Sequence, residues 1–162
     1  MFITIADFSS GKYELHTGMY DVTRLQAYID KYESLYLINL LGADLYADFI
    51  ANLADPKYVK IYDPFNQDHN WCIMISEGMK VMLLGFVYFE YLKDLTNQIT
   101  PNGNVRPIGE NSADVSTLYT MMYTRYNESI KTYTAIQYYI CLETEFDYVD
   151  FNGQKKESAY WI

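Results

Sequence analysis

The sequence contains few of the residues from which catalytic and metal-binding sites are built. Two histidines and two cysteines occur among 162 residues. There is no Glu-x-x-His pair, and His69 and Cys72 lack the second pair that would complete a zinc site. A Gly-x-Ser-x-Gly elbow and a glycine-rich phosphate loop are also absent. We therefore expect no catalytic residue, no bound metal and no cofactor.

Basic residues are scarce and are never grouped. Twelve Lys and Arg stand against 21 Asp and Glu, which gives a formal net charge of −9. The densest basic cluster is Lys155-Lys156. A protein that grips nucleic-acid phosphates needs clustered lysines and arginines. Direct nucleic-acid binding is therefore not expected, although an acidic wall is able to lie beside DNA without holding it.

No hydrophobic run is long enough to cross a membrane. The longest, around residues 81–91, is interrupted by Gly85 and Glu90 and falls short of the roughly 20 residues that a spanning helix needs. The N-terminus lacks the basic start and apolar core of a signal peptide. Cys72 and Cys141 each lie in an apolar stretch, which favours two buried free thiols over a disulfide. We expect the protein to be made in the cytoplasm and not to associate with a membrane.

Tyrosine is the residue in excess. The chain has 18 tyrosines, and with 8 Phe and 2 Trp the aromatic content reaches 17%. Tyrosine offers a large contact area at low entropic cost, and its hydroxyl tolerates a wet edge. It is therefore enriched where proteins meet proteins. Two interpretations stay open: a tyrosine-biased core, or a surface that contacts other proteins.

Hydrophobic periodicity predicts one mainly helical domain. Asp21 is a candidate N-cap for a helix that ends at Gly42. A second helix is expected over residues 43–53 and is closed by Asp55-Pro56. The buried face of the first is predicted at Val22, Leu25, Ile29, Tyr32 and Tyr36, and that of the second at Leu45, Phe49 and Leu53.

Two longer helices are predicted in the second half. Residues 76–98, with Ser76 as the cap, are apolar nearly all round, which is typical of a central buried helix. Gly85 in their middle indicates close approach by a neighbouring backbone. Residues 112–143 form a last helix of about 45 Å, long enough to project or to lie along a partner. Its predicted face is Leu118, Met122, Arg125, Tyr126, Ser129, Tyr133, Ile136 and Ile140.

The remaining segments carry turn and strand signals. Residues 1–20 read as an extended arm with at most one short strand, and residues 57–75 as irregular. A short strand is expected near residues 58–62, and residues 71–75 fit either a strand or the approach to a helix. The Pro101-Asn102-Gly103 turn predicts a small β-hairpin between the last two helices, with an exposed tip.

The predicted fold is mainly α: an antiparallel bundle of about four helices with that hairpin and an extended C-terminal tail. We divide the chain into an N-terminal arm (1–20), a helical domain (21–145) and an aromatic tail (146–162). The tail has aromatics on both sides of the Asn152-Gly153 turn. Such a tail must pack against its own domain or against another subunit.

One carboxylate pair deserves a chemical interpretation. Glu90 and Asp94 lie one helical turn apart, and two acids are able to serve a glycosidase. The neighbouring Lys93 favours surface ion pairs instead. A hydrolase that uses Glu90 is therefore the least favoured of three functional hypotheses, and the other two are non-enzymatic.

Several short sequence segments resemble those of a known protein family. They are SEGMK, GFVYFEYLKDLTNQ, TPNG, GENS, RYNESIKTYTAIQYYI and DFNGQKKESAYWI, spread over residues 76–162. They resemble the head–tail connector (adaptor) proteins of tailed bacteriophages, especially those of crAss-like phages. The likeness covers about residues 30–162 and contains no catalytic signature.

This resemblance implies a structural, non-enzymatic virion protein. Such connectors form rings, typically of twelve copies, below the portal protein at the neck of the particle. They extend the channel through which DNA passes without sequence-specific binding, and they meet other neck or tail proteins. Heterologous ring contacts need two different adhesive faces. The candidate interface residues are Pro101, Asn102, Gly103, Phe146, Tyr148, Phe151, Tyr160, Trp161 and Ile162.

An alternative function keeps the helical fold but not the ring. In it, the chain is a non-enzymatic protein–protein interaction module that forms a small oligomer, such as a dimer.

Overall fold

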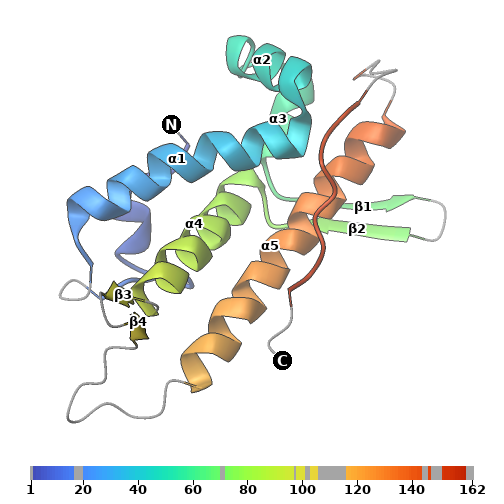
Figure 1. Ribbon diagram of the computed structural model, residues 1–162. Coiled ribbons are helices and arrows are strands. Elements are labelled where there is room, and N and C mark those ends of the chain that lie inside the picture. Colours follow the sequence, from blue (N-terminus) through green and yellow to red (C-terminus); the bar gives the residue numbers. More distant parts are fainter. Residues whose placement is uncertain are drawn as a thin grey trace.

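The centre of the fold is α4 (Met79–Thr96), which lies between α1 (Val22–Leu41) and α5 (Ser116–Leu142) (Figure 1). The computed structural model describes residues 2–16, 20–69, 72–96, 98–100, 103–105, 116–143, 146 and 151–159. These residues are mainly helical, with two small antiparallel two-stranded sheets. The prediction of a mainly helical chain is confirmed.

Helix α4 is enclosed on nearly every side, as its apolar sequence predicts. Its buried residues are Met79, Met82, Leu83, Leu84, Phe86, Val87, Tyr88, Phe89, Tyr91 and Leu92. Gly85 allows the closest approach, because a Cβ at this position would lie 1.9 Å from Ser129 Oγ and 2.9 Å from the Tyr13 hydroxyl. The predicted close approach is real, but side chains make it rather than a neighbouring backbone.

The ends of α1 follow from capping. The Asp21 carboxylate accepts a hydrogen bond from Arg24 N (2.9 Å), and Gly42 ends the helix with φ +79°, as expected for these residues. Leu25, Ile29 and Tyr36 are buried. Val22 is 56% exposed because it is the first helical residue and does not reach the core, so its predicted burial is wrong.

Two short helices follow in place of one helix and a strand. Helix α2 (Ala43–Ala51) buries Leu45 and Phe49, but it ends before Leu53, which is 45% exposed. The predicted strand near residues 58–62 is wrong, because these residues belong to α3 (Pro56–Tyr62). Asp55 caps this helix by accepting from Lys57 N, and proline suits its first turn. Asp55-Pro56 therefore starts a helix as well as ending one.

The segment after α3 forms a β-hairpin, although the sequence alone did not decide between a strand and the approach to a helix for residues 71–75. Strand β1 (Phe65–His69) pairs with β2 (Cys72–Ser76), and Gln67 lies opposite Met74. Ser76 ends the strand instead of capping α4. Its hydroxyl accepts from Gly78 N, and Gly78 turns the chain into α4 with φ +93°.

The first residues are not an extended arm. Ile5–Phe8 form a 3-10 helix, η1. Ile3, Phe8, Tyr13 and Leu15 are buried in the core, and the Glu33 carboxylate of α1 accepts from Ile3 N (3.0 Å). The prediction of an extended conformation is therefore wrong over η1, because this apolar segment covers one side of the helices.

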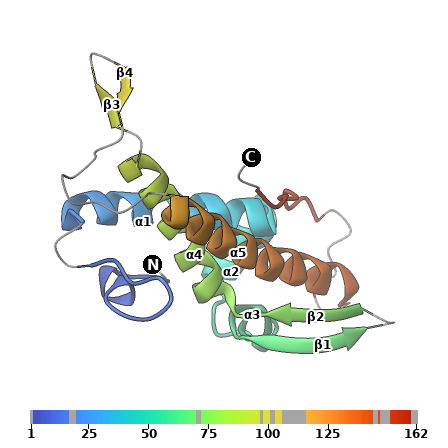
Figure 2. The same cartoon turned by 90° about the horizontal axis from the view of Figure 1, so that it is seen from below.

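The predicted hairpin between the long helices is present. Strand β3 (Gln98–Thr100) pairs with β4 (Gly103–Val105), and Figure 2 shows the pair standing away from the helices. The tip residues Pro101 and Asn102 lie outside the described residues.

Helix α5 packs along its own core instead of projecting from it. Met122, Ser129, Tyr133, Ile136 and Ile140 are buried, which confirms most of the predicted face. The side chain of Leu118 is outside the described set.

Most tyrosines belong to the core. Among the described side chains seven are buried, seven more are partly buried and packed against the core, and Tyr138 is exposed. Several hydroxyls tie elements together: Tyr36 donates to Glu90 (2.9 Å), and Tyr28 donates to Asp94. The tyrosine-biased core is thus the better interpretation for the described residues.

We expect Gly85→Ala to lower the free energy of unfolding by about 2 kcal/mol, because overpacking against Ser129 outweighs the gain in helix propensity. Urea denaturation measures this. The double variant Gly85→Ala/Ser129→Ala removes the Oγ contact and should recover much of the loss. Equal stability of Gly85→Ala and wild type would contradict the enclosure of α4.

Candidate interaction surfaces

The C-terminal segment 151–159 runs in an extended conformation beside α5 and the end of α1 (Figure 1, red). Gln154 N donates to Asn39 O of α1 (2.6 Å), and the Tyr133 hydroxyl of α5 donates to Gln154 O (2.5 Å). Further along, Asn127 and Ala159 exchange two hydrogen bonds of 2.8 and 2.9 Å. This part of the tail therefore packs against its own domain.

Gln137 joins three parts of the fold at one point. It is a polar side chain that is only 9% exposed. Its Nε2 donates to Leu40 O (3.1 Å) and to Gln154 O (3.0 Å). One amide thus satisfies carbonyls of α1 and the tail from α5, as buried polar groups require. Sequence reasoning missed Gln137; its one signal was a polar residue beside the apolar face of α5.

Two glycines allow the tail to approach. A Cβ on Gly153 would lie 2.4 Å from Leu40 O, and one on Gly42 would lie 1.8 Å from Asn152 Oδ1. Side chains at either position would push the tail away from α1. Asn152-Gly153, predicted as a turn, is instead part of an extended contact in which glycine is needed for space.

The predicted interface residues have different fates. Phe146 is 3% exposed and its ring packs near those of Tyr58 and Tyr139, so it lies in the core and not on a free surface. Phe151 is half-buried at the tail, and Gly103 is the first residue of β4. Outside the described residues lie Pro101, Asn102, Tyr148, Tyr160, Trp161 and Ile162.

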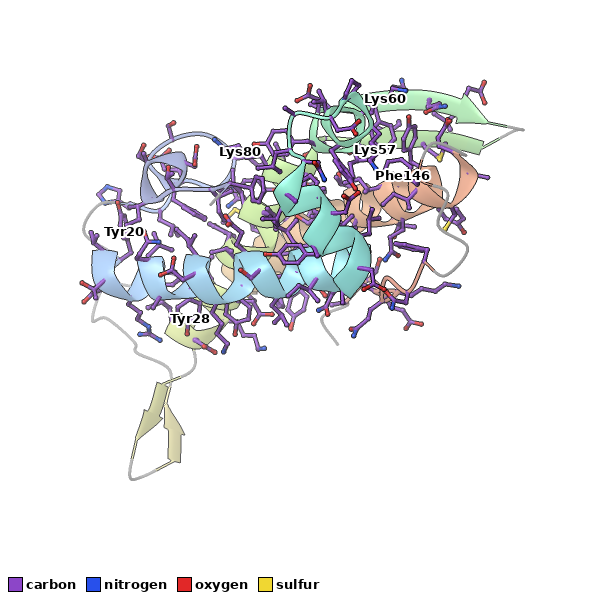
Figure 3. All side chains as sticks on the ribbon, turned by 90° about the horizontal axis from the view of Figure 1, so that it is seen from above. Tyr20, Tyr28, Lys57, Lys60, Lys80 and Phe146 are labelled. Carbon is purple, nitrogen blue, oxygen red and sulfur yellow. The ribbon has the colours of Figure 1, made fainter. Side chains whose placement is uncertain are left out.

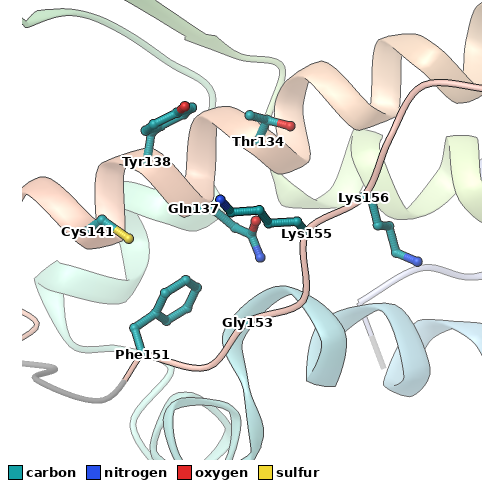
Figure 4. Close-up of a pocket in the computed structure, with 8 residues that line it drawn as sticks. All are labelled: Thr134, Gln137, Tyr138, Cys141, Phe151, Gly153, Lys155 and Lys156. Atoms are coloured by element: carbon teal, nitrogen blue, oxygen red, sulfur yellow. The ribbon is translucent and has the colours of Figure 1, made fainter.

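The outward side of α5 carries a ridge between two hollows, which we call the α5 ridge (Thr134 and Tyr138). Tyr138 is 58% exposed. Thr134 and Tyr138 line both hollows, each of about 430 Å³. The first lies toward the tail and includes Cys141, Phe151 and Lys155 (Figure 4). The second lies toward β2 and includes Ile73, Ile75, Ile130 and Ala135.

Strand β2 is apolar on both faces, but only one face is covered. Met74 and Ser76 are buried, whereas Ile73 and Ile75 are 65% and 59% exposed. A strand that is apolar on both faces is typical of one covered on both sides. Exposed apolar patches mark interaction sites in soluble proteins. The β2 side of the α5 ridge is therefore a candidate interaction surface.

Two lysines lie on opposite sides of the α5 ridge. Lys131 lines the hollow toward β2 and Lys155 the hollow toward the tail, and within the described residues neither has an ion pair. The side chain of Lys156 points away from that of Lys155 in Figure 4, and its Nζ lies 4.6 Å from the centre of the Tyr36 ring. Burial lowers the pKa of Lys156 despite the nearby Glu90 carboxylate.

A second apolar surface lies at the N-terminus, α2 and α3, and we call it the α2–α3 hollow. It measures about 300 Å³ and is lined by Phe2, Phe49, Leu53, Val59 and Tyr62. Leu53 and Val59 are 45% and 42% exposed. Lys57 and Lys60 lie on the same short helix, next to β1 (Figure 3).

The α2–α3 region has more acids than bases. Residues 43–63 contain four aspartates and two lysines, a formal charge of −2. Asp48 accepts hydrogen bonds from the Tyr58 hydroxyl and from Lys57 Nζ (3.1 Å). The hydrogen bond from Tyr58 contributes most, and that from Lys57 next, to lowering the pKa of Asp48.

The carboxylates considered for hydrolysis join helices instead. Glu90 accepts from Tyr36, and its other oxygen lies 3.5 Å from Lys93 Nζ, which confirms the predicted ion pair. Asp94 accepts from Tyr28. Both acids thus link α1 to α4 through tyrosine hydroxyls.

Three further findings concern metals, thiols and membranes. In the described part of the chain, no three His, Cys, Asp or Glu side chains lie close enough to hold a metal ion. Cys141 is a free, exposed thiol, so its predicted burial is wrong. No single helix among the described residues is long and apolar enough to cross a membrane; α1 and α2 together pass by length and composition, but they are bent by 113°.

Comparison with known proteins found no relative. No protein-family model, no curated protein and no solved structure matches the chain.

We expect Gln137→Met to lower the free energy of unfolding by about 1–3 kcal/mol, because the buried Leu40 carbonyl loses this donor and the Gln154 carbonyl is left with the Tyr133 hydroxyl. Hydrogen exchange at the Gln154 amide should become faster, since the tail is held less firmly to Asn39. Gln154→Met is the matched control, because Gln154 has an exposed side chain and contributes through its backbone. Unchanged exchange in Gln137→Met would contradict the role of Gln137.

Asp48 should make stability depend on acid pH. Its pKa is lowered in the folded state, so its contribution is present above the ordinary value of 3.8 and is lost as pH falls through the lowered value. Asp48→Asn should therefore be less stable than wild type at pH 6, with the difference shrinking below pH 3.8. Thermal melts across this range measure it. A difference that stays constant down to the lowest pH would contradict the link.

Proposed function

We propose that this chain is a structural subunit of a tailed bacteriophage, forming a ring below the portal that joins the capsid to the tail and extends the DNA channel. The observation that carries the proposal is the placement of exposed apolar residues on two unlike surfaces, the α5 ridge with β2 and the α2–α3 hollow. A closed ring of identical subunits uses two different faces on each copy.

The sequence resemblance supplies the biological setting. The matching segments fall largely on α4, α5 and the tail, which together build the core and one of the two surfaces. An antiparallel bundle of about four helices and a ring of about twelve copies belong to this proposal. The proposal also includes the portal protein and other neck or tail proteins as partners, and the neck of the virion as the location.

Charge also supports the proposal. The chain carries a net charge of −9, and its basic residues are dispersed among ion pairs and ring contacts such as Lys12 with Glu128 and Lys80 with Asp7. A wall of this kind repels phosphates weakly and evenly, so DNA is able to slide past it. The proposed role is non-enzymatic.

The test is assembly of the full chain, alone and with the portal protein of the phage that encodes it. We expect ring-shaped oligomers by negative-stain electron microscopy and a mass near twelve copies by native mass spectrometry. Portal protein alone is the control. A chain that stays monomeric at all concentrations and ignores the portal would overturn the proposal. A plain dimer without rings would favour the interaction module instead.

A further inference from the structure

We propose that the ring contact is made by the α5 ridge of one copy and the α2–α3 hollow of the next, with Tyr138 as the central side chain. This inference rests on the proposed function, because it names the two faces that a ring of these subunits would use. The partner is thus a second copy of this chain.

The α5 ridge has the character of the inserting side. Tyr138 is the exposed tyrosine among the described side chains, and the exposed Ile73 and Ile75 line the hollow beside it. Interface energy concentrates in a few central residues, and tyrosine is enriched among them, because an aromatic ring excludes water while its hydroxyl keeps a partner. The surrounding isoleucines would then shield the ring from solvent.

The α2–α3 hollow has the character of the receiving side. It is concave, about 300 Å³, and lined by three aromatic rings together with Leu53 and Val59. This volume lies at the lower end of the range in which small organic groups are bound by proteins. Aromatic rings pack well edge to face, so Phe2 and Tyr62 offer partners to an entering tyrosine.

Charge selects this pairing over contact between like faces. Lys131 and Lys155 flank the α5 ridge and have no ion pair within the described residues. The hollow itself is lined by apolar and aromatic residues, and the α2–α3 region around it has a formal charge of −2, from four aspartates against Lys57 and Lys60. Two ridges would bring these lysines of the ridge together, and two hollows would bring two regions of net negative charge together. Ridge to hollow instead brings the lysines to a region of net negative charge, and complementary charge fixes partner choice and register.

The two surfaces share no residue and come from different elements. The ridge belongs to α5, beside β2 and the tail, whereas the hollow is formed by Phe2, by α2 and α3, and by the turn between these two helices. A contact between them is heterologous, so each copy keeps one free ridge and one free hollow until the ring closes.

The first experiment compares one replacement at three exposed apolar positions. Tyr138→Asp changes the ridge, Leu53→Asp changes the hollow, and Val22→Asp is the control, because Val22 is 56% exposed but lies on neither surface. We expect the first two variants to raise the dissociation constant of the subunit contact by about tenfold or more, which is the effect of changing a central interface residue. The control should assemble like wild type. Circular dichroism melts check that all three variants fold.

The second experiment mixes the two defective variants. The Leu53→Asp copy keeps its ridge and the Tyr138→Asp copy keeps its hollow, so an equal mixture should form pairs of chains that neither variant forms alone. Native mass spectrometry counts the chains. Each pair would contain one copy of each variant, which isotope labelling of one variant shows directly.

The outcomes separate the two proposals. If wild type forms rings but Tyr138→Asp also does, or Val22→Asp is equally defective, or the mixture stays monomeric, this contact is wrong and the ring stands. If wild type stays monomeric with and without portal protein, the proposed function itself fails and takes this inference with it.

Discussion

Enclosure of α4 is the constraint on which the rest of the structure depends. An 18-residue helix with apolar side chains on nearly every face has to be covered from all sides. Helix α1 covers one side and α5 another, while residues 2–15 and α3 cover parts that these helices leave open. The N-terminal segment is therefore held in the core by Ile3 and Phe8, although its sequence carries few structural signals of its own.

The tail shows how the same constraint reaches residues far from α4. Gly85 lets α5 approach α4 closely through Ser129, and the tail runs along α1 and α5 where these two helices both cover α4. Glycines at positions 42 and 153 leave room for the tail, and Gln137 supplies the hydrogen bonds that an extended segment cannot make with itself. Hydrogen bonds hold this segment, while the side chains of Gln154, Lys155 and Glu157 stay exposed.

Sequence patterns predicted the elements whose signals are local. The Asp21 cap, the Gly42 stop, the burial of α4 and the hairpin at residues 98–105 need only neighbouring residues to specify them. Residues 56–62 were mistaken because Asp55-Pro56 is both a helix end and a helix start, and β-branched and aromatic residues suggested a strand. The junction at Gln137 and the contact of Asn152 with Gly42 depend on residues about 100 positions apart, and no local pattern encodes such pairs.

The candidate surfaces were less predictable still, because they are defined by what remains uncovered after folding. Most tyrosines in the sequence looked equally able to serve an interface, yet the core takes seven of them and leaves Tyr138 exposed. Residues 71–75 fitted either a strand or the approach to a helix, and neither interpretation showed that β2 leaves Ile73 and Ile75 exposed on one face. Local rules that are satisfied elsewhere fail at these few positions, and such failures concentrate at functional sites. An acidic chain that leaves Lys131 and Lys155 on either side of the α5 ridge, with Ile73 and Ile75 exposed next to it, thus has a surface whose charge and shape suit the proposed contact with a second copy.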